Sequence, residues 1–395
     1  MEVLRKDGVV SLDSEVNNIL NIIDEELDPI NQIKRRVLVK DGELFIDTQV
    51  FPISTKIHLF GVGKSSPYEV KAFIELLSEH GQDGYIEQAV CLTKLGHSIC
   101  DNRIEQIEGS HPKISSTTID NSNKFINKLR GVQEGDLLVF FLSGGASALL
   151  EIPHEKISFL ELERKYQDFS LSDKSITEIN KERRKYSTIK NGGLRSYIQT
   201  KNFIQFINND IPSLHIYDVG SGPLLKLGES YDDTFILNDA DNLLKRIKEK
   251  INCPYYHIYD EPLSGALDKI VKNLPSENEF FLSGGELSVD VTKLGGIGGR
   301  NTHFVLSLAL EIFKNSNNQN IKILSYATDG DDGNSKCAGA YIDYSTFIEN
   351  KSLAIECLNN YDSHSFFKSV GGLIKGRPKY SNLMDVRVIW NSSKV

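Results

Sequence analysis

The 395-residue sequence has few cysteines, and their arrangement does not suggest a metal or disulfide site. The five cysteines, an odd number, form no CxxC pair and no zinc-binding spacing, so we expect reduced thiols, as in a cytosolic protein. The sequence also lacks an apolar run of the roughly 18 residues that a membrane helix needs. Its N-terminus lacks the apolar segment of a signal peptide. These absences predict a cytoplasmic protein without a membrane partner.

Positive charge is in short supply as well. The 45 Lys and Arg residues are outnumbered by 54 Asp and Glu residues, which gives a net charge of −9. This balance argues against nucleic acid as a main partner. An anionic ligand must then be held by local charges and by backbone N–H groups. The content of 39% hydrophobic and 25% charged residues is otherwise that of a globular protein, and the length favours two domains.

Short apolar runs alternate with segments in which apolar residues recur at helical spacing. The expected strands are 56–63, 136–145, 203–208, 279–285 and 321–330, and the expected helices between them are 66–81, 117–132, 241–251, 263–274 and 303–315. Alternating strands and helices predict βαβ units with a mostly parallel sheet. The polar stretch Gly220–Asp233 is the best candidate for a linker. The simplest architecture is two α/β lobes, each a mostly parallel sheet flanked by helices, which meet at a cleft.

The hexapeptide FFLSGG occurs twice, at 140–145 and at 280–285, each time where an expected strand ends. Ligands bind beyond the carboxyl ends of parallel strands, and glycines there let the backbone approach a ligand closely. A following helix start adds N–H groups that attract phosphate. The first copy, Ser143-Gly144-Gly145 with Ser147 in the next turn, is therefore a candidate phosphate loop. The alternative is a tight turn with a serine cap.

The segment GVGKSS (61–66) contains neither of two common nucleotide-binding motifs. A P-loop needs a glycine where His58 stands, and a dinucleotide fingerprint needs one where Ser66 stands. The absent fingerprint gives no support to an oxidoreductase. What remains is Lys64, on the turn after an expected strand, where a lysine can bind phosphoryl oxygens. An isolated surface lysine is the alternative.

Two later turns could supply further charged groups. GGIGGRN (295–301) displays Arg300 from a glycine-rich loop, and an arginine there suits a bidentate grip on carboxylate or phosphate. The alternative is a flexible hairpin with a solvated arginine. ATDGDDGNS (327–335) ends an expected strand and carries Asp329, which could contact Mg²⁺ or serve as base for a substrate hydroxyl. A plain Asp/Gly turn is the alternative.

Together these motifs resemble the glycerate 2-kinase family that carries a C-terminal MOFRL domain. The resemblance runs from about Lys56 to Ile389 and rests on ten individually weak motifs in family order. They are GVGK, the His-Pro at 111–112, FLSGGASALL, NKERRKYSTIKNGG (180–193), NDIP (209–212), SGP (221–223), FLSGGE, GGIGGRN, TDGDDG with CAGA (337–340), and DSHSFF (362–367). Generic α/β similarity would not preserve that order.

The resemblance implies a Rossmann-like N-terminal domain (1–232) and a MOFRL-type α/β domain (233–395), with the active site between them. It also implies transfer of the γ-phosphoryl group of ATP, with Mg²⁺, to the 2-hydroxyl of D-glycerate or of a related small hydroxy acid. The family's proposed catalytic lysine and arginine fall on Lys64 and Arg300. Assembly into a homodimer is left open.

The remaining site residues are predicted in three groups. Asp210 and Asp329 are candidates for metal contact or catalytic base on chemical grounds rather than from a matched assignment. The predicted nucleotide and phosphate site consists of Ser143, Gly144, Gly145, Ser147, Lys190 and Gly222. The predicted substrate site consists of Ser283, Gly284, Gly285, Glu286, Asn301 and Arg377.

The sequence departs from the family pattern in two loops. Ser213-Leu214 replaces a Gly-Asp pair, and GRPKYSN (376–382) replaces TGPTGTN, which adds Arg377, Lys379 and Tyr380. If the second loop contacts substrate, these changes favour a larger or more acidic acceptor. Two alternatives to a glycerate kinase therefore stay open. One is a kinase of this fold that acts on a sugar acid or a glycan-precursor unit, and the other is a non-catalytic binding protein that retains the fold.

Overall fold

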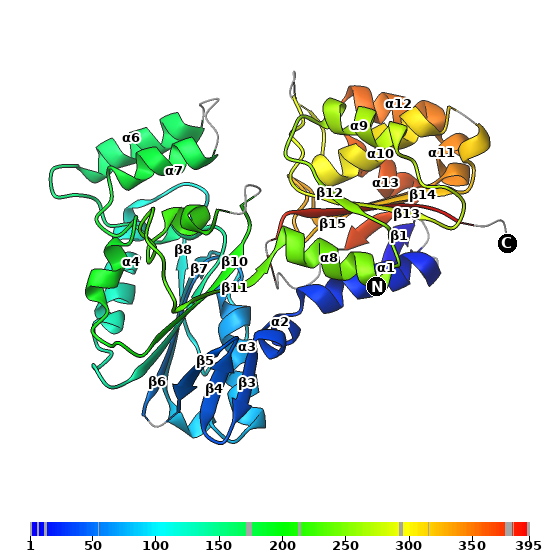
Figure 1. The fold of residues 1–395 in the computed structure, drawn as a ribbon. Helices are drawn as coiled ribbons and strands as arrows, with labels where there is room; N and C mark the ends of the chain where they lie inside the picture. Colours follow the sequence, from blue (N-terminus) through cyan, green and yellow to red (C-terminus); the bar gives the residue numbers. More distant parts are fainter. Residues whose placement is uncertain are drawn as a thin grey trace. The chain divides into compact units, whose positions relative to one another are not determined.

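The chain folds into two compact α/β units (Figure 1). Residues Asp28–Asp239 form what we call the middle unit, and Met1–Leu27 together with Ala240–Val395 form the terminal unit. The computed structural model describes residues 2–5, 8–11, 14–53, 55–170, 176–211, 215–291, 295–314, 316–375, 381 and 383–392. Each unit has its own sheet and its own buried core.

These units differ from the predicted domains, which divided the chain after residue 232. The boundary falls after Asp239, and the first 27 residues belong to the terminal unit. There α1 (Ser14–Leu27) packs on α8 (Ala240–Lys250) and shares its apolar cluster. The apolar face of α1 predicts a buried helix, but it does not specify which of two cores the helix covers. Sequence pattern alone therefore could not assign this segment.

A six-stranded parallel sheet forms the centre of the middle unit. Its strands in spatial order are β11 (Thr234–Asp239), β10 (Phe203–Asn209), β9 (Leu137–Leu142), β6 (Ile57–Val62), β7 (Ile86–Lys94) and β8 (Glu105–Gly109). Every neighbouring pair is parallel. The chain lays down β6 first, adds β7 and β8 on one side, and then adds β9, β10 and β11 on the other. This is the strand order of dinucleotide-binding Rossmann folds, so the Rossmann-like prediction is confirmed.

Helices cover both faces of this sheet, which explains why its strands are continuous apolar runs. The other elements of the unit are α2 (Pro29–Arg36), β3 (Val37–Lys40), β4 (Glu43–Ile46), β5 (Gln49–Pro52), α3 (Ser66–Glu79), α4 (Ser116–Leu129), α5 (Ala146–Leu149), α6 (Phe159–Ser170) and α7 (Ile176–Arg184). Leu59 of β6 packs in the cluster of Phe73 from α3. Its neighbour Phe60 packs against Phe125 of α4, in a separate cluster. The order of strands reverses between β6 and β9, which is where such folds bind ligands.

The terminal unit contains an eight-stranded sheet that is mostly antiparallel. Its strands in spatial order are β12 (Tyr256–Ile258), β13 (Phe280–Gly284), β17 (Asp385–Asn391), β14 (Ile321–Ala327), β15 (Cys337–Asp343), β16 (Leu373–Lys375), β1 (Glu2–Arg5) and β2 (Gly8–Ser11). Among these strands only β12 and β13 pair in parallel. The α/β class is confirmed, but the prediction of a mostly parallel sheet in each lobe is wrong for this unit.

The connections explain this difference. Residues 328–336 join β14 to β15, and they are too few for the crossover of about a dozen residues that parallel strands need. The last strand, β17, then inserts between β13 and β14 and runs antiparallel to both. Neither β15 nor β17 was among the expected strands. The helical pattern of the preceding segments suggested a series of βαβ units, whereas the described strands of this sheet form one, β12–α9–β13.

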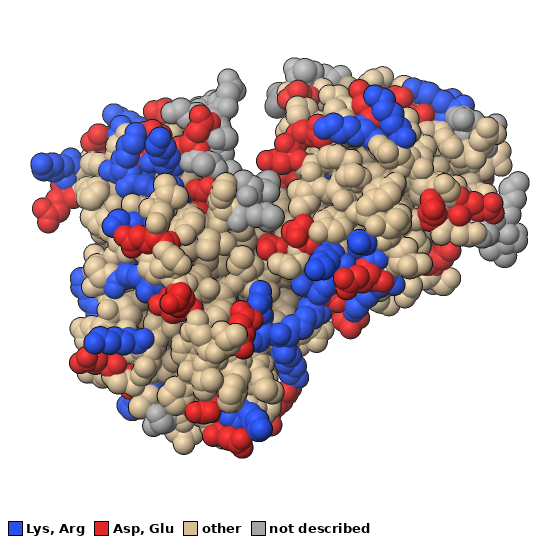
Figure 2. All heavy atoms as spheres, in the orientation of Figure 1, with Lys and Arg blue, Asp and Glu red and all other residues tan. Residues whose placement is uncertain are grey.

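Helices also cover both faces of the terminal sheet (Figure 1). On the face opposite α1 and α8 lie α9 (Leu263–Lys272), α10 (Arg300–Ile312), α11 (Tyr344–Glu349), α12 (Lys351–Asn359) and α13 (Ser363–Val370). In the part of the chain that the structure describes, no helix is both long and apolar enough to cross a membrane. Basic and acidic side chains lie next to one another over much of the visible surface (Figure 2).

Gly63, at the end of β6, should be sensitive to any side chain. It has a φ of +134°, and a Cβ atom there would lie 2.2 Å from Ser143 Oγ and 2.6 Å from Ser143 O. Gly63→Ala should therefore lower the free energy of unfolding by about 2 kcal/mol or more, measured by urea unfolding. Gly135→Ala is the matched control, because a Cβ there meets nothing within 4 Å. Equal stability of the two variants would contradict the packing described here.

Candidate active site

The turns that follow β6 and β9 meet where the strand order reverses. Ser143 N–H donates to Val62 O at 3.0 Å, and Lys64 N–H donates to Gly144 O at 2.9 Å. Gly63 lies against Ser143 with no room for a side chain. The predicted catalytic Lys64 and the predicted phosphate loop are therefore brought together by direct backbone contact.

The second of these turns presents backbone donors. Gly144 and Gly145 have N–H groups that donate to no acceptor among the described residues. The ring of His111 and the side chain of Lys64 both lie within 3.3 Å of where a Cβ on Gly145 would stand. Ser143 Oγ is buried against Gly63 without a partner in the described chain, and its contact with phosphate stays a prediction. The following helix α5 begins after Gly145 without a side-chain cap, so the turn is not a serine cap.

Positive charge gathers around His111. The pKa of His111 is lowered to about 3, first by burial and then by the charges of Lys64 and Lys94, with smaller contributions from His97 and Arg183. The imidazole is therefore neutral near pH 7. Cationic side chains beside a turn with unpaired N–H groups create an environment that favours a polyanion such as a phosphate chain.

The other predicted phosphate-site residues of this unit lie behind the turn. Lys190 Nζ is buried and donates to Glu151 Oε2 at 2.5 Å and to Ser147 O at 3.1 Å. Ser147 Oγ lies 2.8 Å from Ser221 Oγ, and Gly222 follows with a φ of +66°. These contacts fix the position of the helix after the turn. Direct contact of Lys190, Ser147 or Gly222 with phosphate stays a prediction.

A buried carboxylate links the Lys64 turn to β10, which lies two strands from β6 in the sheet. Glu69 of α3 accepts hydrogen bonds from Ser65 Oγ (2.7 Å) and from Asn208 Nδ2 of β10 (2.6 Å). Burial raises the pKa of Glu69 to about 7, against the opposing effect of the two hydrogen bonds. Asp210, the candidate base or metal ligand, directly follows β10 and is partly buried. The topology thus places Asp210 at the same edge of the sheet as Lys64.

In the terminal unit, Arg300 begins α10 and is held by two carboxylates. Its Nε and Nη2 atoms donate to Asp385 at 2.5 and 3.2 Å, and Nη2 also donates to Glu286 Oε1 at 2.8 Å. Burial lowers the pKa of Arg300, but Asp385, Glu286 and Asp329 together raise it above its ordinary value. Arg300 therefore stays charged, and three of the predicted residues, Arg300, Glu286 and Asp329, belong to one electrostatic cluster.

Asp332 fixes the start of α10. Its carboxylate accepts hydrogen bonds from the N–H groups of Asn301 (2.8 Å) and Thr302 (2.9 Å), which are donors that a helix start leaves unpaired. Asn301 Nδ2 donates in turn to Asp385 Oδ1 at 3.0 Å. Asp385 therefore holds both Arg300 and Asn301. The predicted substrate residue Asn301 is buried within this network rather than presented at its surface.

The second Ser-Gly-Gly turn packs around a buried arginine. Arg387 of β17 donates to Ser283 Oγ at 3.2 Å, to Gly285 O at 3.0 Å, and to Gly284 O. Gly285 has a φ of +96°, and a Cβ there would lie 2.2 Å from Tyr259 O. This turn is held from inside the protein through its carbonyl groups. Its contact with a substrate stays a prediction.

The glycine-rich segment before Arg300 is a packed turn and not a flexible hairpin. The N–H groups of Gly296–Gly299 all donate to protein acceptors. A Cβ on Gly296 would lie 2.4 Å from Asp362, and one on Gly298 would lie 2.5 Å from Ser363 Oγ. Glycine is thus required for close packing. The side chain that this loop presents is that of Arg300, the first residue of α10.

Three residues that join the terminal network had no predicted role: Asp385, Asp332 and Arg387. A signal for Arg387 was present, since an arginine inside the apolar strand DVRVIWN requires a buried partner. Arg377 and the altered loop residues 213–214 and 376–380 lie outside the described residues. Within the described ranges, no group of three or more His, Cys, Asp or Glu side chains could hold a metal ion.

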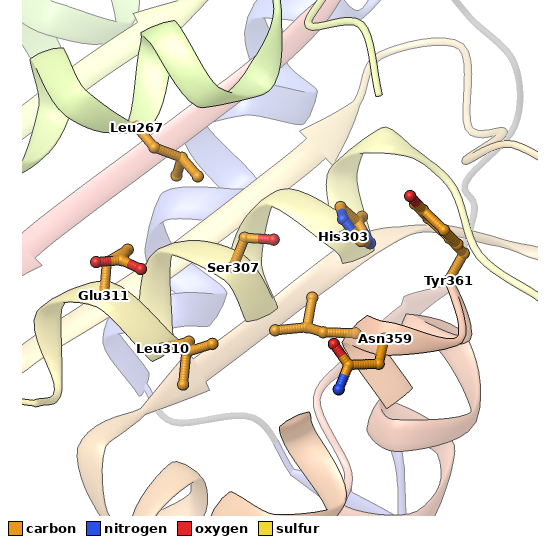
Figure 3. A pocket seen from close by; sticks show the side chains of 8 residues that line it. Leu267, His303, Ser307, Leu310, Glu311, Asn359 and Tyr361 are labelled. Atoms are coloured by element: carbon orange, nitrogen blue, oxygen red, sulfur yellow. The ribbon is translucent and has the colours of Figure 1, made fainter. Parts of the chain in front are cut away.

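A pocket of 470 Å³ lies between α9, α10 and α12 of the terminal unit and contains none of the predicted site residues. His303 and Tyr361 line it and stack with ring centroids 5.6 Å apart (Figure 3). His303 is one turn of α10 beyond Arg300. Burial lowers the pKa of His303.

The middle unit thus has a Rossmann-type sheet edge at which Lys64 meets a Gly-Gly turn, and the terminal unit has an arginine held by a carboxylate network. These are the features of a two-domain α/β protein with a candidate site for an anionic ligand. A family model described as a domain of unknown function, DUF4147, matches residues 16–253, and the MOFRL family model matches residues 279–385. The chain belongs to the DUF4147 family and carries a C-terminal MOFRL domain, which confirms the resemblance found in the sequence.

Similar proteins include named kinases. The chain is 28% identical over 403 residues to the glycerate 2-kinase of Sulfurisphaera tokodaii. The match covers 92% of this chain and 96% of that protein. It is 28% identical over 424 residues to the glycerate 2-kinase of Picrophilus torridus, with coverage of 93% and 94%. The crystal structure of a glycerate kinase from Thermotoga maritima matches its fold with a TM-score of 0.77 at 22% identity, over 96% of this chain and all of that one.

Removal of the Asp385 charge should destabilise the terminal unit. Asp385→Asn leaves Arg300 and the buried Arg387 without their shared carboxylate, so the free energy of unfolding should fall by about 3 kcal/mol. Glu286→Gln is the matched control, because that carboxylate is 45% exposed and should contribute less than about 1 kcal/mol. Urea unfolding at pH 7 measures both. Similar losses in the two variants would contradict the central position of Asp385.

Glu69→Gln should stabilise the protein in a pH-dependent way. The pKa of Glu69 rises from 4.5 to about 7 on folding, so the native state holds the proton longer and stability is lost as pH rises through that window. Gln avoids the buried charge and keeps the acceptor oxygen. The gain should reach up to about 3 kcal/mol at pH 8 and vanish below pH 4.5.

Urea unfolding between pH 4 and pH 8 measures this difference. Glu75→Gln, at a 43% exposed carboxylate on the same helix, should show no such pH dependence. A gain for Glu69→Gln of equal size at every pH would show that the carboxylate of Glu69 is not buried as described.

Proposed function

We propose that the protein is an ATP-dependent kinase that phosphorylates a hydroxyl group of D-glycerate, at the 2-position, or of a closely related small hydroxy acid. One observation carries the proposal: Lys64 and the unpaired N–H groups of Gly144 and Gly145 meet at the point where Rossmann-type sheets bind ligands. The relatives named glycerate 2-kinase, which match nearly the whole chain, support glycerate as acceptor.

Phosphoryl transfer depends on positioning and on charge neutralisation, and the chain has groups for both. Lys64 and the Gly144–Gly145 turn would hold the phosphates of ATP. Arg300 would bind either the acceptor carboxylate or the transferring phosphoryl group, since its planar fork suits both. The acceptor hydroxyl oxygen attacks the γ-phosphorus, the bond to ADP breaks, and the hydroxyl proton passes to a carboxylate. Asp210 and Asp329 are the candidates for that base.

Mg²⁺ fits the same residues. A magnesium ion on a nucleotide takes one or two protein carboxylates and draws its other ligands from phosphates and water. Asp210 in one unit and Asp329 in the other are each single carboxylates of this kind, so a preformed cluster of three acids is not required. The ion would neutralise charge on the phosphates.

A second acceptor class has one observation in its favour. In the segment 376–382, Arg377, Lys379 and Tyr380 replace small residues of the family pattern. Added bulk and positive charge favour a larger or more acidic acceptor, such as a sugar acid. A non-catalytic protein that binds nucleotide alone would retain Lys64 but would show no turnover with any acid.

ADP release from Mg·ATP across D-glycerate, L-glycerate, tartronate and several aldonic acids tests the proposal. Lys64→Ala and Arg300→Lys should each lower kcat by about 100-fold or more while the fold is retained, because each removes a group that stabilises charge in transfer. Lys71→Ala, at a 42% exposed lysine on α3, should leave kcat unchanged. A variant that keeps most of its turnover would remove that residue from the mechanism, and absence of ATP binding would overturn the kinase function.

A further inference from the structure

We propose that Arg183 of α7 is an additional anion-binding residue of the middle unit, which contacts a phosphoryl group held at the Lys64 turn. Arg183 is not among the site residues predicted from the sequence. The identity of the phosphate as part of a nucleotide rests on the proposed function, whereas the site itself rests on the contacts described below.

Two adjacent arginines of α7 differ in the hydrogen bonds that their side chains make. Arg184 is fully engaged, since its Nη2 donates to Asp218 Oδ1 at 2.8 Å and to Tyr217 O at 2.5 Å. Arg183 makes one weak hydrogen bond within the described chain, from Nη1 to Asn180 Oδ1 at 3.4 Å. Its Nε is buried and has no acceptor there. Acceptors within the described chain therefore account for the position of Arg184 but not for that of Arg183.

Among the described residues, no carboxylate accepts a hydrogen bond from Arg183. The guanidinium lies 4.9 Å from the centre of the Tyr166 ring, and Glu151 is the acid that acts on it. Glu151 Oε2, however, already accepts hydrogen bonds from Lys190 Nζ and from Tyr166 OH. One carboxylate therefore faces two cations. A largely buried cation without its own counter-ion costs free energy, and such groups are concentrated at sites that bind charged ligands.

The surroundings of Arg183 point to a phosphate-containing ligand. Tyr166, on which the guanidinium lies, shares an apolar cluster with Ala148 of α5, the helix that begins directly after Gly145. Arg183 also acts on His111, whose ring borders Gly145 and Lys64. The Arg183 donors that have no acceptor in the described chain, together with Lys64 and the Gly144 and Gly145 N–H groups around His111, would match the oxygens of a di- or triphosphate.

Binding of ADP and of inorganic pyrophosphate to the full chain, without Mg²⁺ and at fixed salt, tests this proposal by calorimetry. Arg183→Gln should weaken both affinities by about 10- to 100-fold, the range for a hydrogen bond to a charged group. Its melting temperature without ligand should stay the same or rise, because an unneutralised buried charge is removed. Lys181→Gln, at an exposed lysine of the same helix, should match the wild type in both measurements.

Arg184→Gln provides the contrast for a structural role, and its melting temperature should fall. The proposal is overturned if Arg183→Gln binds pyrophosphate as the wild type does, or if its affinity and its melting temperature fall together as in Arg184→Gln. Pyrophosphate binding that depends on Arg183, in a protein that phosphorylates none of the acids, would uphold this site and reject the kinase function. A wild-type protein that binds neither compound would reject both.

Discussion

The backbone contact between Gly63 and Ser143 constrains most of what the middle unit can do. It locks the ends of β6 and β9 together at the point where the strand order reverses, and it admits no side chain at position 63. With the two strand ends fixed, the N–H groups of the following turn cannot fold back onto the sheet. Lys64 follows Gly63 directly and donates its N–H group to Gly144 O, and the ring of His111 borders Gly145. The arrangement of the candidate anion site thus depends on a packing restriction.

The repeated hexapeptide shows how context decides the use of a motif. In the middle unit the Ser-Gly-Gly turn ends a parallel strand, and Lys64 N–H donates to Gly144 O. In the terminal unit the same residues end a strand that lies antiparallel to β17, and the Arg387 side chain of β17 donates to the carbonyl groups of Gly284 and Gly285. One turn is thus held by the backbone of a neighbouring turn, and the other is held by a buried side chain.

The sequence predicted some features of this protein and not others, and the two turns illustrate the division. Apolar runs and turn glycines identified β6, β9, β10, β13 and β14, and motif order identified the family. Strand direction in the terminal unit was not predictable, because β17 inserts between β13 and β14 from a position late in the chain. The pairing of Arg300 with Asp385 was not predictable for the same reason, since Asp385 begins β17. Residues adjacent in a motif could be found, whereas those joined by sheet topology could not.

The two sites also differ in how their charge is balanced. Arg300 is held by the buried Asp385 and by the more exposed Glu286, while its Nη1 donates to no acceptor in the described ranges. Its charge is compensated before any ligand arrives. In the middle unit Lys64, Lys94 and Arg183 surround a neutral His111, and Glu151 is already bonded to Lys190. If a phosphate binds beside Arg183 as proposed, it adds negative charge there, and because it binds only the folded protein it would stabilise the middle unit.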